Sequence, residues 1–210
     1  MHTLTLASAS PARLGLLRAC GIEPAVLVSD VDETAVEARA REGDPAITPG
    51  EVAQLLAEAK GADVAPRAGS PGPVLACDSV LELDGEIFGK PHTAGRARER
   101  WARMRGRTGV LHTGHWLTMT DGAGGVSPAV GRSASARVTF ADVGDAEIEG
   151  YIATGEPLHV AGGFTIDGRG APFVEGIEGH PSTVVGVCLP LLRTMLAELG
   201  TAWWDLAVPS

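Results

Sequence analysis

Apolar and polar positions in the first part of the chain predict the order strand, helix, strand. Residues 2–8 are short and rich in β-prone side chains, which is typical of a strand. Pro11 suits the first turn of a following helix, with Ser10 as its N-cap and Gly21 at its end. Residues 25–34 predict a second strand that ends in an acidic loop.

A helix, a hairpin and a second helix come next. In residues 48–65, apolar side chains recur at the i, i+3, i+4 and i+7 spacing of a helix. Residues 71–91 predict a strand, a tight turn at Asp84–Gly85 and a short return strand. Residues 93–106 predict a basic helix. The apolar positions of the first helix are Val52, Leu55, Leu56 and Ala59.

The second half of the chain mixes strands and helices again. Because the two kinds of element are interleaved throughout, we expect the α/β class, with a long mixed central β-sheet flanked by helices. We find no internal repeat, and only a weak boundary near residues 89–93. The predicted elements are strands at 108–121 and 133–140, a helix at 144–157, glycine-rich turns and short strands over 161–178, and a helix at 189–200 with Leu189, Leu192, Leu196 and Leu199 on one face.

Composition narrows the class of protein. The chain has 210 residues, of which 44% are apolar, enough for one α/β domain or two small lobes. Its 17 basic and 26 acidic residues give a net charge of −9, which opposes nucleic-acid binding unless cations gather locally. Three dispersed cysteines fit a reducing compartment. With no secretory or membrane-spanning segment, we expect a cytoplasmic protein without membrane partners.

The corner after the first strand carries candidate anion ligands. Backbone N–H groups at a helix start point outward, and the helix dipole favours negative charge there. Ser8 and Ser10 add hydroxyl donors, and Arg13 adds a planar guanidinium that suits phosphate oxygens. The alternative is ordinary structure, in which Ser10 is only a cap and Arg13 a solvated helix residue.

Two acids and a lysine extend this set of candidates. Asp32 and Glu33 stand at the end of the second predicted strand. We interpret Asp32 as part of an acidic loop, whereas Glu33 offers the carboxylate oxygens that a hard divalent cation takes. Lys60 is expected at a helix C-terminus, where it either compensates the dipole or neutralises a phosphate.

Asp78 is the sharpest feature of the sequence. It lies within residues 74–80, an otherwise apolar segment of strand character. Burying a carboxylate costs several kcal/mol unless it is paired or bound to metal, so this position predicts a functional acid. Lys90 follows in a rigid loop between Gly89 and Pro91, where it is either a second cation for a polyphosphate or a solvated residue.

Five groups of motifs occur in a characteristic order and spacing. They are LASASPARLGLL at 6–17, VDET at 31–34, LAEAK at 56–60, ACDSV with GEIFGKP within 76–91, and residues 146–179 with the VVG of 184–186. None is decisive alone, but together they span nearly the whole chain. In this order the chain resembles the Maf family of nucleoside triphosphate pyrophosphatases.

The resemblance implies one Maf-like domain over residues 1–210, with two lobes around a nucleotide-binding cleft. It implies hydrolysis of a standard or modified nucleoside triphosphate to the monophosphate and pyrophosphate, with Mg²⁺ or Mn²⁺ as cofactor, as house-cleaning of the nucleotide pool. By position, Asp78 matches the proposed catalytic base and, with Glu33, a metal ligand. The matching phosphate-binding positions are Ser8, Ser10, Arg13, Lys60 and Lys90.

The chain departs from the family pattern at positions linked to base specificity. Ala12 stands where one branch has arginine and a sister branch, which prefers methylated guanine, has tryptophan. Ser79 stands where the first branch has threonine. Asp167 replaces a glutamine or a glutamate and leans towards the second branch. Val160 stands where the family often has lysine, so a cation is missing there.

Several other residues are expected to have structural roles. Cys77 has no histidine in a fitting motif, so we interpret it as a small buried residue. His112 and His115 are three positions apart on a predicted strand and therefore face opposite sides of it. The arginines of residues 93–106 predict a solvated face. The pair Trp203–Trp204 is expected in the core or at a dimer contact.

Two rival functions stay open from the sequence. One is a non-catalytic nucleotide-binding regulator of cell division and septum formation, which Ala12 and Val160 mildly favour and the retained Asp78 opposes. The other is an RNA-binding accessory protein that uses the arginine-rich helix, which the net charge opposes. Our leading expectation is the enzyme, a homodimer that takes a small-molecule nucleotide and no nucleic acid.

Overall fold

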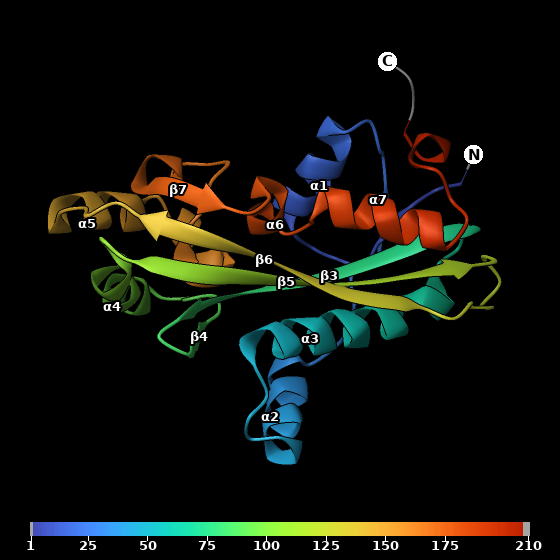
Figure 1. Cartoon of the computed structure of the whole chain (residues 1–210), viewed down its shortest axis with the longest axis horizontal. Helices are drawn as coiled ribbons and strands as arrows, with labels where there is room; N and C mark the ends of the chain where they lie inside the picture. Colours follow the sequence, from blue (N-terminus) through green and yellow to red (C-terminus); the bar gives the residue numbers. More distant parts are fainter. Residues whose placement is uncertain (1, 208–210) are drawn as a thin grey trace.

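A seven-stranded mixed sheet lies at the centre of the described molecule (Figure 1). The structure is a computed structural model, and it describes residues 2–207. The strand order is β2-β1-β3-β5-β6-β7, and β4 pairs with one end of β3. β1 runs parallel to β2 and β3, and the other pairs are antiparallel. The strands are β1 Thr5–Leu6, β2 Ala25–Val26, β3 Gly72–Leu83, β4 Glu86–Phe88, β5 Thr108–Thr120, β6 Val130–Phe140 and β7 Val174–Glu178.

Helices cover both faces of this sheet, as the predicted α/β class requires. α1, α6 and α7 lie over one face and α3 over the other, with α2 projecting away beyond α3 (Figure 1). Within residues 2–207, no helix has the length and apolar content needed to cross a membrane. The helices are α1 Pro11–Ala19, α2 Glu33–Gly43, α3 Pro49–Val64, α4 Ala94–Met104, α5 Asp145–Ala153, α6 Pro181–Val185 and α7 Leu189–Glu198, with 3₁₀ turns at Ala65–Arg67, Glu156–His159, Ala161–Gly163, Ala171–Phe173 and Trp203–Asp205.

Local signals set the ends of several elements. The Ser10 hydroxyl accepts a hydrogen bond from the Arg13 amide at the start of α1. Thr48 and Glu51 form a reciprocal capping box that begins α3. The turn between β3 and β4 lies at Asp84 and Gly85, which both have positive φ, as a two-residue hairpin turn requires. The Ser10 cap and the Asp84–Gly85 turn confirm predictions from the sequence, whereas the capping box at Thr48 was not predicted.

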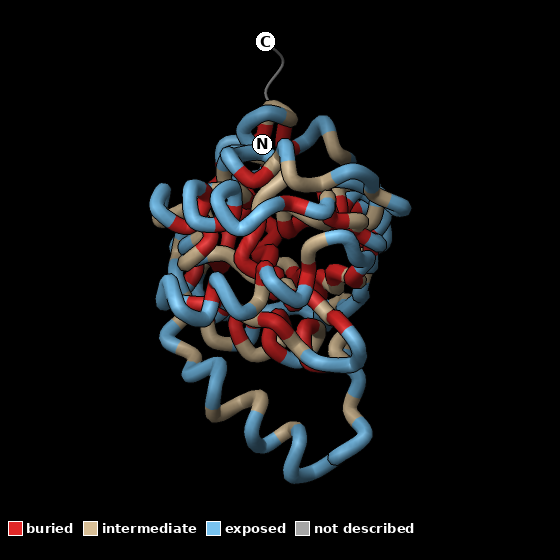
Figure 2. The backbone as a smooth tube through the Cα atoms, turned by 90° about the vertical axis from the view of Figure 1, so that its left-hand side faces the viewer, coloured by how far each residue is buried: buried red, intermediate tan, exposed pale blue. Residues whose placement is uncertain are grey.

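Two segments differ from the sequence prediction. The second strand is much shorter than residues 25–34, because β2 contains only Ala25 and Val26. Glu33 does not end a strand but begins α2, with Asp32 as the N-cap that accepts from the Ala35 amide at 3.0 Å. The five-residue helix α6 was also not predicted. Figure 2 shows that α2 carries no buried residue, so it lacks the apolar stripe that would reveal a helix in the sequence.

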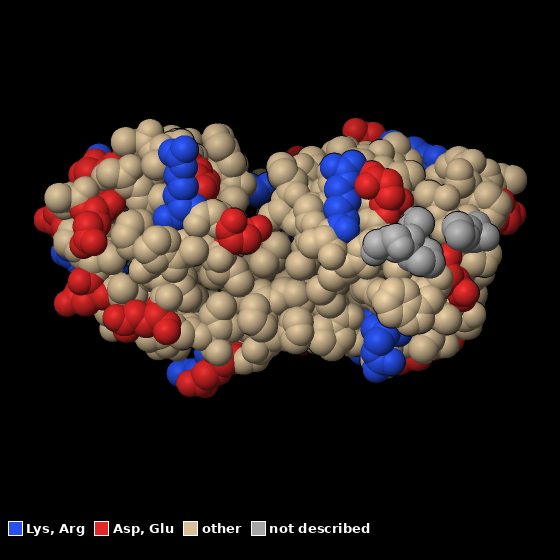
Figure 3. Space-filling model, turned by 90° about the horizontal axis from the view of Figure 1, so that it is seen from above, with Lys and Arg blue, Asp and Glu red and all other residues tan. Residues whose placement is uncertain are grey.

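The core of the described residues contains three apolar clusters, two large ones and a third that consists mainly of small residues such as Ala7, Ala65 and Ala76. One of the large clusters, here the Trp101 core, includes Leu81 and Leu83 of β3; the other, the Leu192 core, includes Leu75 and Cys77 of the same strand. Trp101 itself meets the rings of Phe140, Tyr151 and Phe173 edge to face, with centroids 5.6–5.8 Å apart. Figure 3 shows a hollow between two halves of the molecule, with lysine or arginine atoms inside it. The division of the chain into two lobes stays a prediction.

Candidate active site

One edge of β3 is open beside Asp78 and Ser79. β1 pairs with β3 only at Val74 and Leu75, and β4 joins the same strand at Leu81 and beyond. Asp78 lies in the middle of the interval that neither short strand covers, while β5 pairs with the opposite edge. The interruption leaves room for a ligand beside a carboxylate that the surrounding apolar segments hold in place.

Helix α3 brings Lys60 to Asp78. The helix lies close to the sheet because two glycines make room: a Cβ at Gly114 would lie 2.4 Å from the Ala53 carbonyl oxygen, and one at Gly61 would overlap the Trp116 ring. Lys60 is buried and its Nζ lies 2.5 Å from Asp78 Oδ1. The residue thus lies inside the helix rather than at its C-terminus, so the alternative of dipole compensation is wrong.

Glu33 completes a three-membered ionic cluster. Its Oε1 lies 2.8 Å from the same Lys60 Nζ, so one ammonium group bridges two carboxylates. Burial raises the pKa of Asp78, and the charges of Lys60 and Arg13 oppose this rise without cancelling it. Burial acts in the same direction on Glu33, but there the hydrogen bond and charge of Lys60, with Lys90 and Arg13, lower the pKa. The two acids are therefore tuned in opposite directions.

Arg13 lies beside this cluster and is largely buried. Its Nε donates to the Gly186 carbonyl oxygen at 3.0 Å, and its two terminal nitrogens donate to Ser8 Oγ and Ser79 Oγ, each at 3.1 Å. The reading of Arg13 as a solvated helix residue is wrong. Three of its five N–H groups are used by the protein, which leaves two for a ligand.

The remaining predicted site residues differ in how they are related to the ionic cluster. Ser10 and Ala12 lie at the start of α1, next to Ser8 and Arg13 in the chain. Lys90 is exposed, but its charge acts on Glu33, which places it in the field of the cluster. Asp167 is exposed, and the structure shows no bond that joins it to the other candidates.

The structure also accounts for the residues that we expected to be structural. Cys77 is fully buried, and burial raises the pKa of its thiol to about 12, which removes it as a nucleophile. His112 bonds Glu82 and Ser135, whereas His115 accepts from the Cys188 amide, so the two rings face opposite sides of β5. The arginines of α4 are on the surface, where Arg98, for example, pairs with Glu149.

Two residues near the site were missed from the sequence. Thr113 of β5 bonds Ser79, and Gly186 at the end of α6 accepts from Arg13. The VVG motif at 184–186 was noted only as part of the family resemblance. Its glycine was the available signal, because Gly186 has a φ of 117°, which side chains other than that of glycine rarely adopt.

The carboxylate oxygens of the site are suitable ligands for a hard divalent cation. Asp78 and Glu33 each bond Lys60 through one oxygen only. Their second oxygens have no hydrogen-bond partner among residues 2–207, and carboxylate oxygen is the ligand type that Mg²⁺ and Mn²⁺ prefer. Two carboxylates do not make a complete protein cage, which agrees with a cation that keeps waters and shares substrate phosphates.

Comparison with known proteins gives a consistent result. A family model described as Maf-like protein matches residues 3–199. The nucleoside triphosphate pyrophosphatase of Salinispora tropica is 56% identical over 205 residues, covering 96% of this chain and 87% of that protein. The proteins of the same name from Leifsonia xyli subsp. xyli and Streptomyces coelicolor are 53% and 51% identical and cover 97% and 99% of this chain and 95% of their own lengths.

Solved structures are more distant. A HAM1 protein from Coxiella burnetii superposes with a TM-score of 0.42 at 18% identity, over 68% of this chain and 75% of that chain. A likeness at that level carries no argument about the site.

Proposed function

We propose, from the premise that this chain belongs to the Maf family, that the open edge of β3 is where its reaction takes place. The chain is a nucleoside triphosphate pyrophosphatase, the activity for which its curated relatives are named. The observation that supports this site is the buried Asp78, which shares Lys60 with Glu33 at the interrupted sheet edge. The alternative of a non-catalytic regulator is not favoured by these relatives.

The bond that breaks in this proposal is the anhydride between the α and β phosphates. The water oxygen bonds to the α phosphorus, pyrophosphate leaves, and a nucleoside monophosphate remains. Asp78 is the group that accepts the proton of the attacking water, and the burial that raises its pKa strengthens it as a base. Its position on the middle of a paired strand keeps it fixed for this task.

Spare donors nearby suit the phosphates. Lys60 has three N–H groups, of which Asp78 and Glu33 take two. Arg13 keeps two, and the hydroxyl hydrogens of Ser8 and Ser10 are also available because both oxygens only accept within the protein. Lys90 is exposed at the edge of the cluster and suits the charge of the leaving pyrophosphate.

Glu33 and Asp78 are the residues that would hold the divalent cation in this proposal. Mg²⁺ or Mn²⁺ bound there would cancel negative charge on the phosphates. Loss of one carboxylate should weaken the cation site without removing the fold, because Glu33 is half-exposed on α2. A readout besides activity is the melting temperature, which a bound cation raises in the wild type and raises less in Glu33→Gln.

Base preference is the least defined part of the proposal. Ala12 offers no ring on which a base could stack, and Asp167 offers an exposed carboxylate that can accept from a base edge. We propose that modified nucleoside triphosphates are among the substrates, as house-cleaning of the nucleotide pool requires. Asp167→Asn should shift the ranking of bases while leaving the reaction type unchanged.

The decisive experiment is a pyrophosphate-release screen over standard and modified nucleoside triphosphates, with Mg²⁺ and Mn²⁺ in turn. We expect release from at least one nucleotide, and a loss of roughly 10²- to 10⁴-fold in Asp78→Asn, the size typical of removing a general base. Equal turnover by the wild type and Asp78→Asn would contradict the proposed site. Glu82→Gln, which changes an acid further along β3, serves as the matched control.

Location and assembly complete the proposal. The three free cysteines suit the reducing cytoplasm, where nucleoside triphosphates are held. A homodimer and the absence of nucleic-acid partners stay predictions. Light scattering of the purified chain tests the first, and RNA retention at rising salt tests the second.

A further inference from the structure

Two of the three hydrogen bonds that hold the Arg13 guanidinium lead to the short helix α6, and the third goes to Ser8 Oγ. The first is direct, because Arg13 Nε donates to the Gly186 carbonyl oxygen. The second is a relay across the sheet, from Arg13 to Ser79 at 3.1 Å, from Ser79 to Thr113 at 2.9 Å, and from Thr113 to the Thr183 carbonyl oxygen at 2.8 Å. Gly186 and Thr183 are themselves bonded, since the Gly186 amide donates to the Thr183 carbonyl at 3.1 Å.

The direction of every bond in the relay is determined. A hydroxyl has a single hydrogen, and that of Thr113 is used on the Thr183 carbonyl. Thr113 must therefore accept from Ser79, which uses the only hydrogen of Ser79. Arg13 can only donate, so Ser79 accepts from it. It follows that the Ser79 hydroxyl has no hydrogen left to donate to a nucleobase. Its oxygen accepts from Arg13 and so helps to orient that side chain.

Gly186 leaves no room for a side chain. Its φ of 117° is unfavourable for any residue with a Cβ, and a Cβ there would lie 2.8 Å from Arg13 Nε and 3.3 Å from Arg13 Cγ. The guanidinium therefore packs against bare backbone. An alanine at this position would push Arg13 away from the carbonyl that now holds it.

The α6 turn is itself anchored to the core of the sheet. Cys188, two residues after Gly186, donates its backbone N–H to His115 Nε2 at 2.8 Å, and His115 is fully buried on β5. The Leu189 amide donates to Ser182 Oγ at 3.0 Å, which ties the end of the turn to its beginning. The turn is thus rigid enough to set the position of a neighbouring side chain.

We propose that Gly186 and Ser79 are positioning residues that aim the two remaining N–H groups of Arg13 at the phosphates of the substrate. The inference rests on the proposed function, because it takes the ligand of Arg13 to be a nucleoside triphosphate. It assigns Ser79 a role different from base recognition. It also gives the α6 turn, which makes no charged contact of its own with the cluster, a part in binding the polyphosphate.

The test compares Gly186→Ala with Gly124→Ala, which has a similar positive φ of 99° but meets only a carbonyl oxygen at 3.8 Å. We expect Gly186→Ala to lower kcat/KM roughly 10- to 100-fold, mostly through a higher KM. The reason is that a displaced Arg13 side chain binds the substrate more weakly. Gly124→Ala should leave both constants unchanged. A merely structural defect would instead lower the active fraction, and with it kcat, at constant KM.

Ser79→Ala is the second variant, in case Gly186→Ala does not fold. It removes the acceptor for one Arg13 nitrogen and should raise KM for every base alike, whereas a base-reading Ser79 would change the ranking of bases. In an Arg13→Ala background, neither substitution should cause a further loss, because the side chain that they position is gone. Effects that add to the loss in Arg13→Ala would overturn the proposal.

An NMR measurement separates this inference from the proposed function. The Arg13 Nε–H should exchange slowly with water in the wild type and in Gly124→Ala, and fast in Gly186→Ala. If the wild type releases no pyrophosphate, the proposed function fails while the exchange result still decides whether Gly186 holds Arg13. Equal exchange in Gly186→Ala and the wild type would overturn the positioning role, whatever the activity.

Discussion

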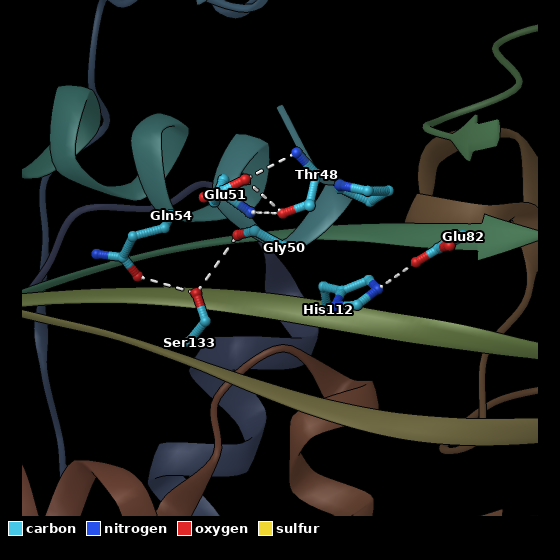
Figure 4. A pocket seen from close by; sticks show the side chains of 8 residues that line it. Thr48, Gly50, Glu51, Gln54, Glu82, His112 and Ser133 are labelled. Carbon is cyan, nitrogen blue, oxygen red and sulfur yellow. Dashed lines mark hydrogen bonds and ion pairs between the residues drawn. The ribbon is translucent and has the colours of Figure 1, made fainter. Parts of the chain in front are cut away.

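Strand β3 carries two acidic residues on one face, each paired with a basic side chain, and only one of these pairs has the character of an active site. Asp78 pairs with Lys60 from the second half of α3, and Glu82, four residues further along the strand, pairs with His112 Nε2 at 2.8 Å near the first turn of α3. Beside the second pair lies a hollow of about 510 Å³, lined also by Thr48, Gly50, Glu51, Gln54 and Ser133 (Figure 4).

The two pairs differ in how many hydrogen-bond donors beside them remain available to a ligand. Next to Glu82 the sheet edge is closed by β4, and both nitrogens of His112 are bonded, to Ser135 and to Glu82. Glu51 is engaged in the capping box. Around Asp78 the edge is open, and Lys60 and Arg13 keep N–H groups that have no partner among residues 2–207. The comparison teaches that spare donors at an interruption of the sheet, rather than the volume of a hollow, mark the site.

Removal of the cation should have the largest effect on stability at the first pair. In Lys60→Met the buried Asp78 loses its counter-ion, and we expect a loss of about 3–5 kcal/mol in the free energy of unfolding. His112→Gln, the matched change at the second pair, should cost about 1 kcal/mol or less. Urea unfolding at neutral pH measures both.

The sign of the pH dependence checks the cause of that loss. Without Lys60, burial raises the pKa of Asp78 further above its unfolded value, so the folded state keeps a proton that the unfolded state releases. The loss in Lys60→Met should therefore be larger at about pH 8 than at about pH 5. A loss that does not change with pH would mean that packing, not charge, is responsible.

How much the sequence predicts depends on whether the signal is local. The helix at 49–64 and the Asp84–Gly85 turn were recognised because spacing and turn chemistry act over a few residues. Asp78 was recognised because its own neighbours in the strand are apolar. By contrast, two of the three side-chain partners of Arg13, Ser79 and Gly186, lie 66 and 173 positions away, so no local pattern could join them to it.

Two other misses have the same physical origin. Lys60 looked like a helix-end cation because its burial depends on Gly61 and Gly114, which let α3 approach the sheet closely. Helix α6 has only five residues and is held by tertiary bonds such as that from Cys188 to His115. Propensity over so short a segment cannot indicate a helix, because a short helix depends on packing for its stability.

His115 sharpens the comparison, since it is a buried ionisable side chain with no acid beside it. Burial, with the charge of Arg13, lowers its pKa from 6.5 to about 4. The unfolded chain therefore takes up a proton at His115 as the pH falls below about 6.5, while the folded chain does not until about 4. Acidification through this window should cost up to about 3.5 kcal/mol of stability, from about 2.5 pKa steps at about 1.4 kcal/mol each.

The measurement is urea unfolding at several pH values across that window. In His115→Gln this component of the slope should vanish, because glutamine does not titrate, although the variant is less stable overall. Gly124→Ala changes no ionisable group, so it should keep the wild-type slope and serves as the control. If His115→Gln lost stability with acid as steeply as the wild type, other groups would have to account for the slope.

The smallest effect is expected at the second pair itself. Glu82 and His112 are partly exposed, at 29% and 16% of their side chains, so water screens their attraction. A double-mutant cycle of Glu82→Gln with His112→Gln should give a coupling energy of about 0.2–1 kcal/mol. Neither single variant should change pyrophosphate release, because both nitrogens of His112 are bonded and a carboxylate such as Glu82 has no N–H group to offer to a phosphate. A loss of turnover in Glu82→Gln as large as that in Asp78→Asn would show that spare donors do not distinguish the two pairs, since the hollow beside Glu82 would then take part in the reaction.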